Sequence, residues 1–468
     1  MNYFTLIYLG IFSLIISVLS FFNIVYSYYF NLYLNLDTYI YSLFISLFLG
    51  LFFLTKKKNE FKTTIYTKII AVLIGYVILP LIISIPFYLS IYNITFLDSY
   101  FEAISGFTST GFTIFDNIKH LDESLILWRS SSQWIGGLYF LFSIIILLDI
   151  FDNNLKKSLT NFLSFNKSET LKQSLKILIL YILLTFLLFI IFKIFDFRTF
   201  ISFNLSMTLI SSGGFLPVNE LSILLNSELK EIIFSLVMLV SFFSIFLSYN
   251  LLFFRSKNIN FFQEDIYLLF YFLFLLFIFF VFFNSDYNFS LILLSLTSSI
   301  SNIGISLNES PSNLSFLFLI LVIIGGSFFS TSSGLRFLKL YALFKFSIND
   351  LISHVKPKNI LINKHLYLDI SFKKEEVNKY FLSLIVFIIS LMFLTSLLSI
   401  SGINFESAFK LSILTLMNTV NSSMYGMSDF DFQELHFFTK YYLIIFMIIG
   451  RVELLTFLII CKKILFKN

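Results

Sequence analysis

Long apolar runs separated by short polar segments dominate the chain. A transmembrane helix needs about 20 predominantly apolar residues, and ten runs approach or exceed this length. The ten runs lie at about 4–29, 39–54, 69–92, 125–151, 177–195, 232–254, 266–283, 314–346, 380–400 and 441–461. The pattern therefore predicts an all-α polytopic membrane protein with ten transmembrane helices.

Four further apolar segments are too short to cross a bilayer. They follow the third, fifth, seventh and ninth runs and lie at Ser99–Phe107, Phe200–Ile210, Phe289–Ile300 and Phe405–Met417. Apolar segments of about 10 to 14 residues are more often re-entrant or buried than spanning. We therefore expect four re-entrant pore helices, each placed between two spans.

A polar segment follows each of these short helices. The four segments, called filter segments 1 to 4, are Thr108–Phe112, Ser211–Phe215, Ser301–Ile305 and Asn418–Ser422. Aligned on Gly111, Gly214, Gly304 and Asn421, they recur at intervals of 103, 90 and 117 residues. A recurring period indicates an internal repeat, here a pseudo-fourfold one. It divides the chain into an N-terminal helix pair (1–60), pore repeats at 61–160, 161–260 and 261–350, and a cytoplasmic insertion with the fourth repeat (351–468).

The repeat suggests a selectivity filter. Irregular backbone at membrane depth is tolerated where protein buries it or where it lines a water-filled cavity. Four such segments around an axis would present rings of carbonyl oxygens that replace the water shell of a cation. Taken singly, each segment also reads as an ordinary turn rich in Ser and Gly. The expected filter residues are Thr110, Gly111, Gly213, Gly214, Ile303, Gly304, Val420 and Asn421.

The apolar run at 314–346 is interrupted by small and polar residues, which predicts a broken helix with a hinge or gate. We call residues 325–334 the gate loop; its candidate hinge or gate residues are Gly325, Gly326, Ser330, Ser333 and Gly334. A helix kinked by small-residue packing is the alternative. Arg451 lies near the middle of a span, where a cation costs roughly 2.5 to 3.5 kcal/mol, so it should face the pore or a partner.

Composition and charge agree with a membrane protein and indicate its orientation. Mean hydropathy is +0.90, and only 13% of the residues are charged. If both termini are cytoplasmic, most of the 32 Lys and Arg residues fall in cytoplasmic loops, as the positive-inside rule requires. The opposite loops are acidic, which would concentrate cations at a pore mouth. The basic loops at 152–176 and 345–379 are candidate docking surfaces for a cytoplasmic partner; orientation by the positive-inside rule is the alternative explanation of their charge.

Several motifs resemble the Trk/Ktr/HKT superfamily of potassium transporters. The resemblance is carried by Phe101–Gly111, Trp128–Gly137, Gly325–Arg336 and Gly450–Thr456, in this order along nearly the whole chain. The additional N-terminal helix pair resembles the Trk-type membrane subunit. The resemblance implies potassium as the substrate and a gate formed by the 325–334 loop. It also implies that Arg451 is a gate residue, pointing into the pore below the filter near this loop. It also implies a homodimer in the lipid bilayer of a bacterial inner membrane, regulated by a cytoplasmic nucleotide-binding subunit.

The fourth filter segment departs from the family pattern, because Asn421 stands where the family has glycine. We expect Asn421 to weaken discrimination between potassium and sodium; in a slipped register, Gly426 would be the filter residue instead. A sodium-permeable or poorly selective transporter of the same fold, and a secondary transporter of another solute, therefore remain alternatives. The sequence contains no HExxH motif, no Walker loop and no cluster of His and Cys. We therefore expect no enzymatic activity and no cofactor within the chain, and we do not expect nucleic acid as a partner.

Overall fold

The helices account for most of the chain. The structure, a computed structural model, describes residues 3–55, 64–151, 170–248, 263–283, 288–354, 374–427, 430–452, 456–459 and 462–463. Among them, seven helices are long and apolar enough to cross a membrane. They are α1 (Tyr3–Tyr29), α2 (Leu36–Leu54), α3 (Ile65–Tyr88), α5 (Glu123–Phe151), α7 (Thr170–Ile194), α11 (Gln263–Phe283) and α15 (Lys374–Ile400).

The four expected pore helices are present and nearly equal in length. They are α4 (Phe96–Phe107), α8 (Thr199–Ile210), α12 (Phe289–Ile300) and α16 (Phe405–Leu416), each of 12 residues. At 1.5 Å per residue each is about 18 Å long, well short of the roughly 30 Å of a bilayer core. Each is therefore too short to cross the bilayer, and its last residue is buried inside the protein where the filter segment begins.

The other expected spans are interrupted. The run at 314–346 forms α13 (Ser315–Ile323) and α14 (Phe337–Ser353), joined through β1 (Ile324–Gly325), the gate loop and β2 (Leu335–Arg336). The run at 232–254 differs from the prediction: α9 (Glu228–Phe242) stops at Phe243, whose backbone is extended. The last run forms α17 (Phe437–Val452). Short 3-10 turns lie at η1 (Ile118–His120), η2 (Leu221–Ile223), η4 (Ser312–Leu314) and η6 (Ser423–Tyr425).

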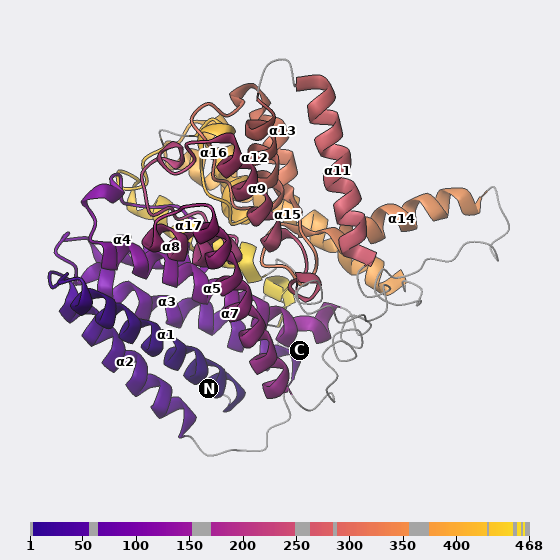
Figure 1. The fold of residues 1–468 in the computed structure, drawn as a ribbon. Helices are drawn as coiled ribbons and strands as arrows, with labels where there is room; N and C mark the ends of the chain where they lie inside the picture. The colour runs from indigo at the N-terminus through magenta and orange to yellow at the C-terminus, as the bar shows by residue number, and fades with distance from the viewer. Residues whose placement is uncertain are drawn as a thin grey trace.

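Contacts between successive repeats close the four repeats into a ring. Figure 1 shows the pore helices α4, α8, α12 and α16 among the longer helices. In each repeat the pore helix packs between a preceding and a following helix, as α4 does between α3 and α5. The following helix of each repeat also contacts the pore helix of the next. These contacts join α5 to α8, α9 to α12, α13 to α16, and α17 to α4. Because the last contact returns to the first repeat, the pseudo-fourfold arrangement predicted from the sequence is confirmed.

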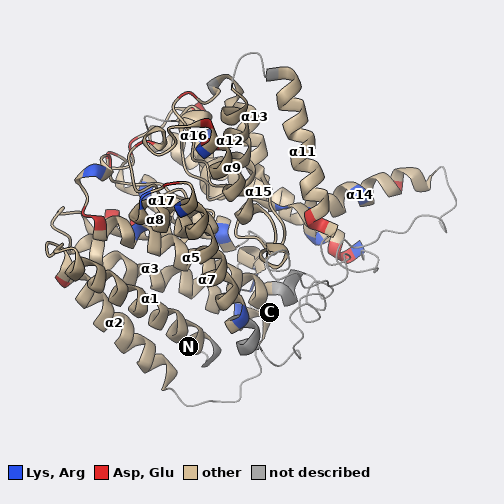
Figure 2. Cartoon of the chain, viewed as in Figure 1, with Lys and Arg blue, Asp and Glu red and all other residues tan. Residues whose placement is uncertain are grey.

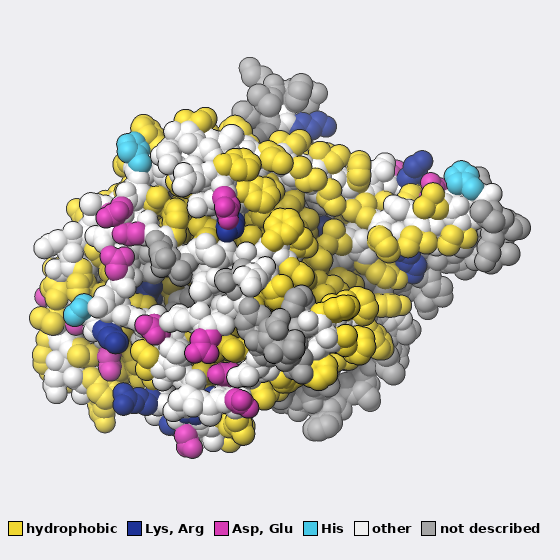
Figure 3. Space-filling view, turned by 90° about the horizontal axis from the view of Figure 1, so that it is seen from above, with side chains coloured by type: hydrophobic (Ala, Val, Ile, Leu, Met, Phe, Trp, Pro, Cys, Tyr) yellow, Lys and Arg dark blue, Asp and Glu magenta, His cyan; other side chains and the backbone are white. Residues whose placement is uncertain are grey.

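Burial separates the central helices from those that face lipid. In α5, 89% of the apolar span is buried inside the protein, whereas in α11 only 22% is. The exposed face of α11 is correspondingly apolar, with Phe270, Phe274 and Phe277. Charged residues avoid the middle of the outer helices and gather at the ends and in the loops (Figure 2), and apolar side chains cover much of the remaining surface (Figure 3). This is the surface expected of a bilayer protein.

The N-terminal helix pair attaches to the first repeat through aromatic rings. Tyr139 of α5 contacts Tyr8 and Phe12 of α1 and Tyr76 of α3, with ring centroids 4.8 to 5.2 Å apart. The Tyr139 hydroxyl donates a 2.8 Å hydrogen bond to the carbonyl of Val72. It can reach this carbonyl because Gly75, one turn further on, has no side chain; a Cβ there would overlap the Tyr139 ring.

We predict that Gly75→Val lowers the melting temperature of the detergent-purified protein. Overpacking of this kind costs about 1–3 kcal/mol, and it would also break the bond from Tyr139 to Val72. The control is Val77→Leu on the same helix, where the side chain is 45% exposed and extra volume meets lipid or detergent. Equal melting temperatures for the two variants would contradict the proposed packing.

Candidate functional site

The four pore helices end in the same backbone geometry. After each helix, one residue adopts a left-handed conformation: Ser109 (φ 58°), Ser212 (φ 53°), Asn302 (φ 58°) and Asn418 (φ 48°). The next backbone N–H returns to the carbonyl five residues earlier, at 2.9 to 3.1 Å. These bonds join Thr110 to Ser105, Gly213 to Thr208, Ile303 to Ser298, and Thr419 to Leu414. This Schellman closure turns the chain away from the helix axis and satisfies a terminal carbonyl.

The equivalent geometry fixes the register of the filter segments. Counting from the left-handed residue, Gly111, Gly214 and Gly304 occupy the same position, and Val420 occupies it in the fourth segment. The alignment of Asn421 with the glycines is therefore shifted by one residue. Asn421 lies one position later, and its side-chain amide donates to the carbonyl of Met427 at 3.3 Å.

The alternative register through Gly426 does not agree with the structure. Gly426 ends the η6 turn in a left-handed conformation (φ 68°). A Cβ placed on it would come near only the Lys410 ammonium, at 3.2 Å, and none of the other filter segments. The glycine therefore serves a turn rather than the ring.

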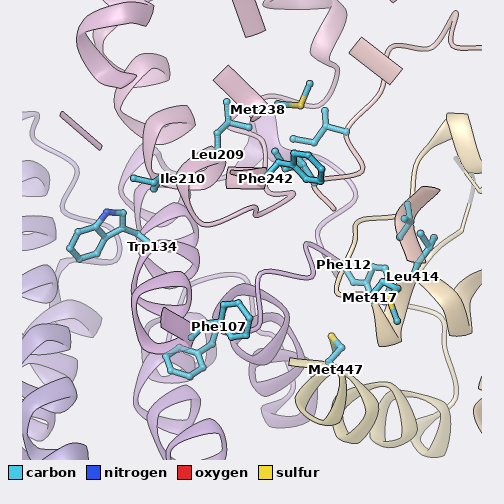
Figure 4. Close-up of a cluster of buried hydrophobic side chains, with 14 of the residues drawn as sticks. Phe107, Phe112, Trp134, Leu209, Ile210, Met238, Phe242, Leu414, Met417 and Met447 are labelled. Atoms are coloured by element: carbon cyan, nitrogen blue, oxygen red, sulfur yellow. The ribbon is translucent and has the colours of Figure 1, made fainter. Parts of the chain in front are cut away.

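The four equivalent positions lie in mutual contact. A Cβ on Gly111 would lie 2.8 Å from the Gly214 Cα and 3.0 Å from the Val420 Cβ. One on Gly304 would lie 2.6 Å from the carbonyl oxygen of Val420. The backbones of all four segments thus meet at one place in the centre of the ring. Buried apolar side chains surround it, several of which are shown in Figure 4.

Glycine is required at these positions for two different reasons. Gly111 and Gly304 have positive φ, 86° and 81°, which disfavours any residue with a side chain. Gly214 does not have a positive φ, but a Cβ on it would lie 2.5 Å from the Cβ of Val420, too close for any side chain. The isopropyl group of Val420 therefore takes the space that Gly214 leaves free.

A buried ion pair supports the first filter segment. Glu102 of α4 and Arg129 of α5 are both at most 1% exposed and lie 2.8 Å apart. Glu102 also accepts from the Ile114 backbone N–H at 3.0 Å and from Thr113 at 3.1 Å, while Arg129 donates to Thr113 at 2.8 Å. The guanidinium of Arg129 also stacks over the ring of Phe215, which ends the second segment, at 4.2 Å. Arg129 thus holds the backbone that follows the first filter segment.

The gate loop is a closed loop whose two ends lie side by side. β1 and β2 pair in parallel, with Ile324 opposite Leu335 and Gly325 opposite Arg336. Gly334 has a positive φ of 80°, and a Cβ on it would lie 2.8 Å from the Gly325 nitrogen. The two glycines therefore allow the strands to approach closely. Most of the loop between them is buried.

The broken end of α9 holds one side of this loop. The carbonyls of Ser241 and Phe242, left free because the helix stops, accept from the backbone N–H groups of Ser332 at 3.1 Å and Ser327 at 3.0 Å. This explains why the run at 232–254 does not form one helix. Glu264, at the start of α11, accepts from Ser327 at 3.0 Å and from the Phe328 backbone at 3.2 Å. An acidic residue directly before an apolar run was the one sequence signal for this contact.

Two arginines approach the gate loop around the ring of Phe140. Arg336 donates to the carbonyl of Ser327 at 3.0 Å and to the Ser330 hydroxyl at 3.1 Å. Arg451 donates to the Ser333 hydroxyl. The guanidinium carbons lie 4.9 Å (Arg336) and 4.0 Å (Arg451) from the centre of the Phe140 ring. Sequence analysis missed Phe140, because nothing distinguishes it from the other phenylalanines.

Arg451 also reaches the filter. It donates to the Ser109 hydroxyl at 3.3 Å and to the Ser211 carbonyl at 3.4 Å. No carboxylate pairs with it among the residues that the structure describes, and Glu453 lies outside them. Arg451 is therefore a buried cation between the filter and the gate loop, held by neutral oxygens and an aromatic ring.

An ion pair at the start of α4 joins the first and fourth repeats. Asp98, in the first turn of α4, pairs with Lys440 of α17 at 2.5 Å. In the loop after the first filter segment, the pKa of Asp116 is raised, first by partial burial and second by the negative charge of Asp431. Most of the basic loop residues, including those of 152–169 and 355–373, lie outside the described residues.

Four short helices around an axis, with irregular backbone meeting between them, define a polytopic membrane protein with re-entrant helices. Comparisons with known proteins agree. A family model described as "Cation transport protein" matches residues 35–262. An uncharacterized cation transporter of Methanocaldococcus jannaschii is 25% identical, over 88% of this chain and 85% of its own length.

Two further relatives extend the match. The Trk system potassium uptake protein TrkH of Escherichia coli K12 is 24% identical over 86% of each chain. The crystal structure of the potassium transporter TrkH from Vibrio parahaemolyticus superposes with a TM-score of 0.83, at 20% identity and covering 98% of both chains. The chain therefore has the fold of that potassium transporter, and over most of its length its sequence is similar to cation transport proteins.

We predict that Glu102→Met lowers the free energy of unfolding by about 3–5 kcal/mol, because it leaves the Arg129 charge buried without its partner. The double variant Glu102→Met with Arg129→Met should recover much of the loss. Thermal melting in detergent measures both. The control is Glu406→Met, since Glu406 is 80% exposed in its pair with Lys410 and exposed pairs contribute little. An additive double variant would contradict the role of the pair.

Proposed function

We propose that the protein carries a monovalent cation, with potassium as the preferred ion, through the ring formed by the four filter segments. The observation that supports this best is the meeting of Gly111, Gly214, Gly304 and Val420 behind four identically closed pore helices. Backbone carbonyls in such a ring can replace the hydration shell of a cation. The names of two similar proteins, a potassium uptake protein and a potassium transporter, favour the same ion.

In this proposal the filter comprises the residues Thr110 and Gly111, Gly213 and Gly214, Ile303 and Gly304, and Thr419 and Val420, with Asn421 just beyond. The gate is the 325–334 loop with Arg451. Arg451 opposes cation passage between filter and gate, since its charge would repel an ion that leaves the ring. The protein would lie in the inner membrane with both termini cytoplasmic, as a homodimer that binds a cytoplasmic nucleotide-binding subunit.

A second candidate, a sodium-permeable or weakly selective transporter of the same fold, is favoured by one specific observation. The Val420 side chain stands in the ring where the other three segments have glycine. It changes the number and position of the carbonyls that can face an ion, on which selectivity depends.

Growth of a potassium-uptake-deficient host at low potassium tests the proposal. We predict that the chain restores growth, and that Arg451→Ala raises the rate of rubidium uptake while the ratio of rubidium to sodium uptake changes little. The reason is that the arginine limits access, whereas the carbonyls set the preference. Rescue by rubidium and potassium but not sodium supports the potassium proposal. No cation uptake by either protein at normal membrane expression would reject it.

We predict that Val420→Gly raises the rubidium-to-sodium uptake ratio by about three- to tenfold, or roughly 0.7–1.4 kcal/mol of discrimination. Removal of the isopropyl group makes the fourth segment equivalent to the others. Uptake of both ions in the same cells, normalised to surface expression, gives the ratio. Asn421→Gly, one position on, is the matched control and should leave the ratio unchanged.

A second pair of variants tests whether the Val420 side chain fills the space beside Gly214. Gly214→Ala should reduce the amount of folded protein because the added methyl meets the Val420 side chain. The same substitution in a Val420→Gly background should be tolerated. If Gly214→Ala is equally harmful in both backgrounds, Val420 does not fill this space and the selectivity argument fails.

A further inference from the structure

The gate loop and the second filter segment are joined by two reciprocal hydrogen bonds. The Thr331 hydroxyl donates to the carbonyl of Ile210, the last residue of α8, at 2.7 Å. The Ser212 hydroxyl, on the left-handed residue of the filter segment, donates to the carbonyl of Thr331 at 2.9 Å. All these groups are buried. The middle of the gate loop is therefore bonded directly to the base of the filter.

The first of these bonds has a clear physical reason. Ile210 ends a helix, so its carbonyl lacks a partner in the next turn and must find one elsewhere in the buried interior. In the first and fourth repeats the equivalent carbonyls, of Phe107 and Leu416, lie against Gly136 of α5 and Gly450 of α17. Those neighbours are continuous helices. In the second repeat the neighbour is a loop that the proposed gating must move.

The second bond acts on the residue that defines the filter geometry. Ser212 is in a left-handed conformation, which costs about 1–2 kcal/mol for a residue with a side chain. Its hydroxyl is held by the gate loop, so the loop helps to maintain that conformation. Gly213 and Gly214 follow immediately. Displacement of the loop would remove this support and leave two buried carbonyls without their donors.

We propose that Thr331 is a positioning residue that couples the gate to the filter, so that opening of the gate loop changes the second filter segment and with it the ion preference. The proposal rests on the proposed function for its transport consequence, but its structural part stands without it. Arg451 also contacts both regions, through Ser333 of the loop and through Ser109 and the Ser211 carbonyl of the filter segments. The Thr331 bonds differ because they hold the Ile210 carbonyl and the hydroxyl of the left-handed Ser212.

Hydrogen exchange measured by mass spectrometry tests the structural part. In Thr331→Val, which keeps the shape and removes the hydroxyl, amide exchange in residues 209–216 should rise by about two- to twelvefold, the equivalent of one hydrogen bond. Ser212→Ala should have a similar effect, and the double variant should show less than the sum because the two bonds act as one unit. Thr331→Ser, which retains the hydroxyl, should restore protection.

The matched control is Ser330→Ala. Ser330 lies in the same loop and is equally buried, but its hydroxyl bonds to Ser327, Ser332 and Arg336 rather than to the filter. It should leave exchange in residues 209–216 unchanged. If Thr331→Val and Ser330→Ala alter this segment equally, or if neither alters it, the coupling is rejected.

Uptake assays then separate the two proposals. With coupling, Thr331→Val shifts the rubidium-to-sodium ratio and the apparent KM for rubidium, whereas Ser330→Ala changes at most the rate. A change of rate alone in Thr331→Val would overturn the coupling to ion preference. If the exchange results hold but the wild-type chain carries no cation, the proposed function is rejected and the structural coupling stands.

Discussion

The structure depends on one constraint: backbone N–H and C=O groups at membrane depth must find partners within the protein. Four pore helices end in the interior, and each end would leave carbonyls without donors. The Schellman closures after α4, α8, α12 and α16 satisfy part of this demand. Neighbouring helices cover the Phe107 and Leu416 carbonyls, and Thr331 bonds to that of Ile210. The ring geometry, the left-handed residues and the glycine positions all follow from meeting this requirement four times around one axis.

The gate region meets the same constraint by pairing two broken helices. The last carbonyls of α9 accept hydrogen bonds from backbone N–H groups of the gate loop. These N–H groups are available because α13 stops before the loop and leaves it non-helical. Each interruption therefore stabilises the other, and neither would be tolerated alone. Arg336 donates to the Ser327 carbonyl of the loop. The guanidinium groups of Arg336 and Arg451 both make cation–π contacts with the ring of Phe140. The gate loop is therefore buried and is held mainly by hydrogen bonds to backbone and side-chain groups.

The fourfold repeat is not uniform at its centre. The first and third segments need glycine because of positive φ, while the second needs it because Val420 of the fourth projects into its space. The position of Val420 does not demand a left-handed backbone, so a branched residue is tolerated there. The second segment is therefore held from two sides: Gly214 packs against Val420 of the fourth segment, and Ser212 hydrogen-bonds to Thr331 of the gate loop. It is the segment through which filter and gate are most closely connected.

The sequence by itself determined the membrane class, the pore helices and the repeat, because hydrophobic length and its interruptions report directly on burial in lipid. It also located the gate loop, since small and polar residues inside an apolar run break a helix there. Only the tertiary structure decided the register of the fourth segment, because glycine spacing cannot reveal which residue follows the left-handed turn. It alone revealed the stop in α9, whose apolar run continues past Phe243, and the roles of Phe140, Glu264 and Thr331. These depend on contacts between residues about 60 to more than 300 positions apart, such as that of Arg451 with Ser109, and such contacts leave no periodic signal along the chain.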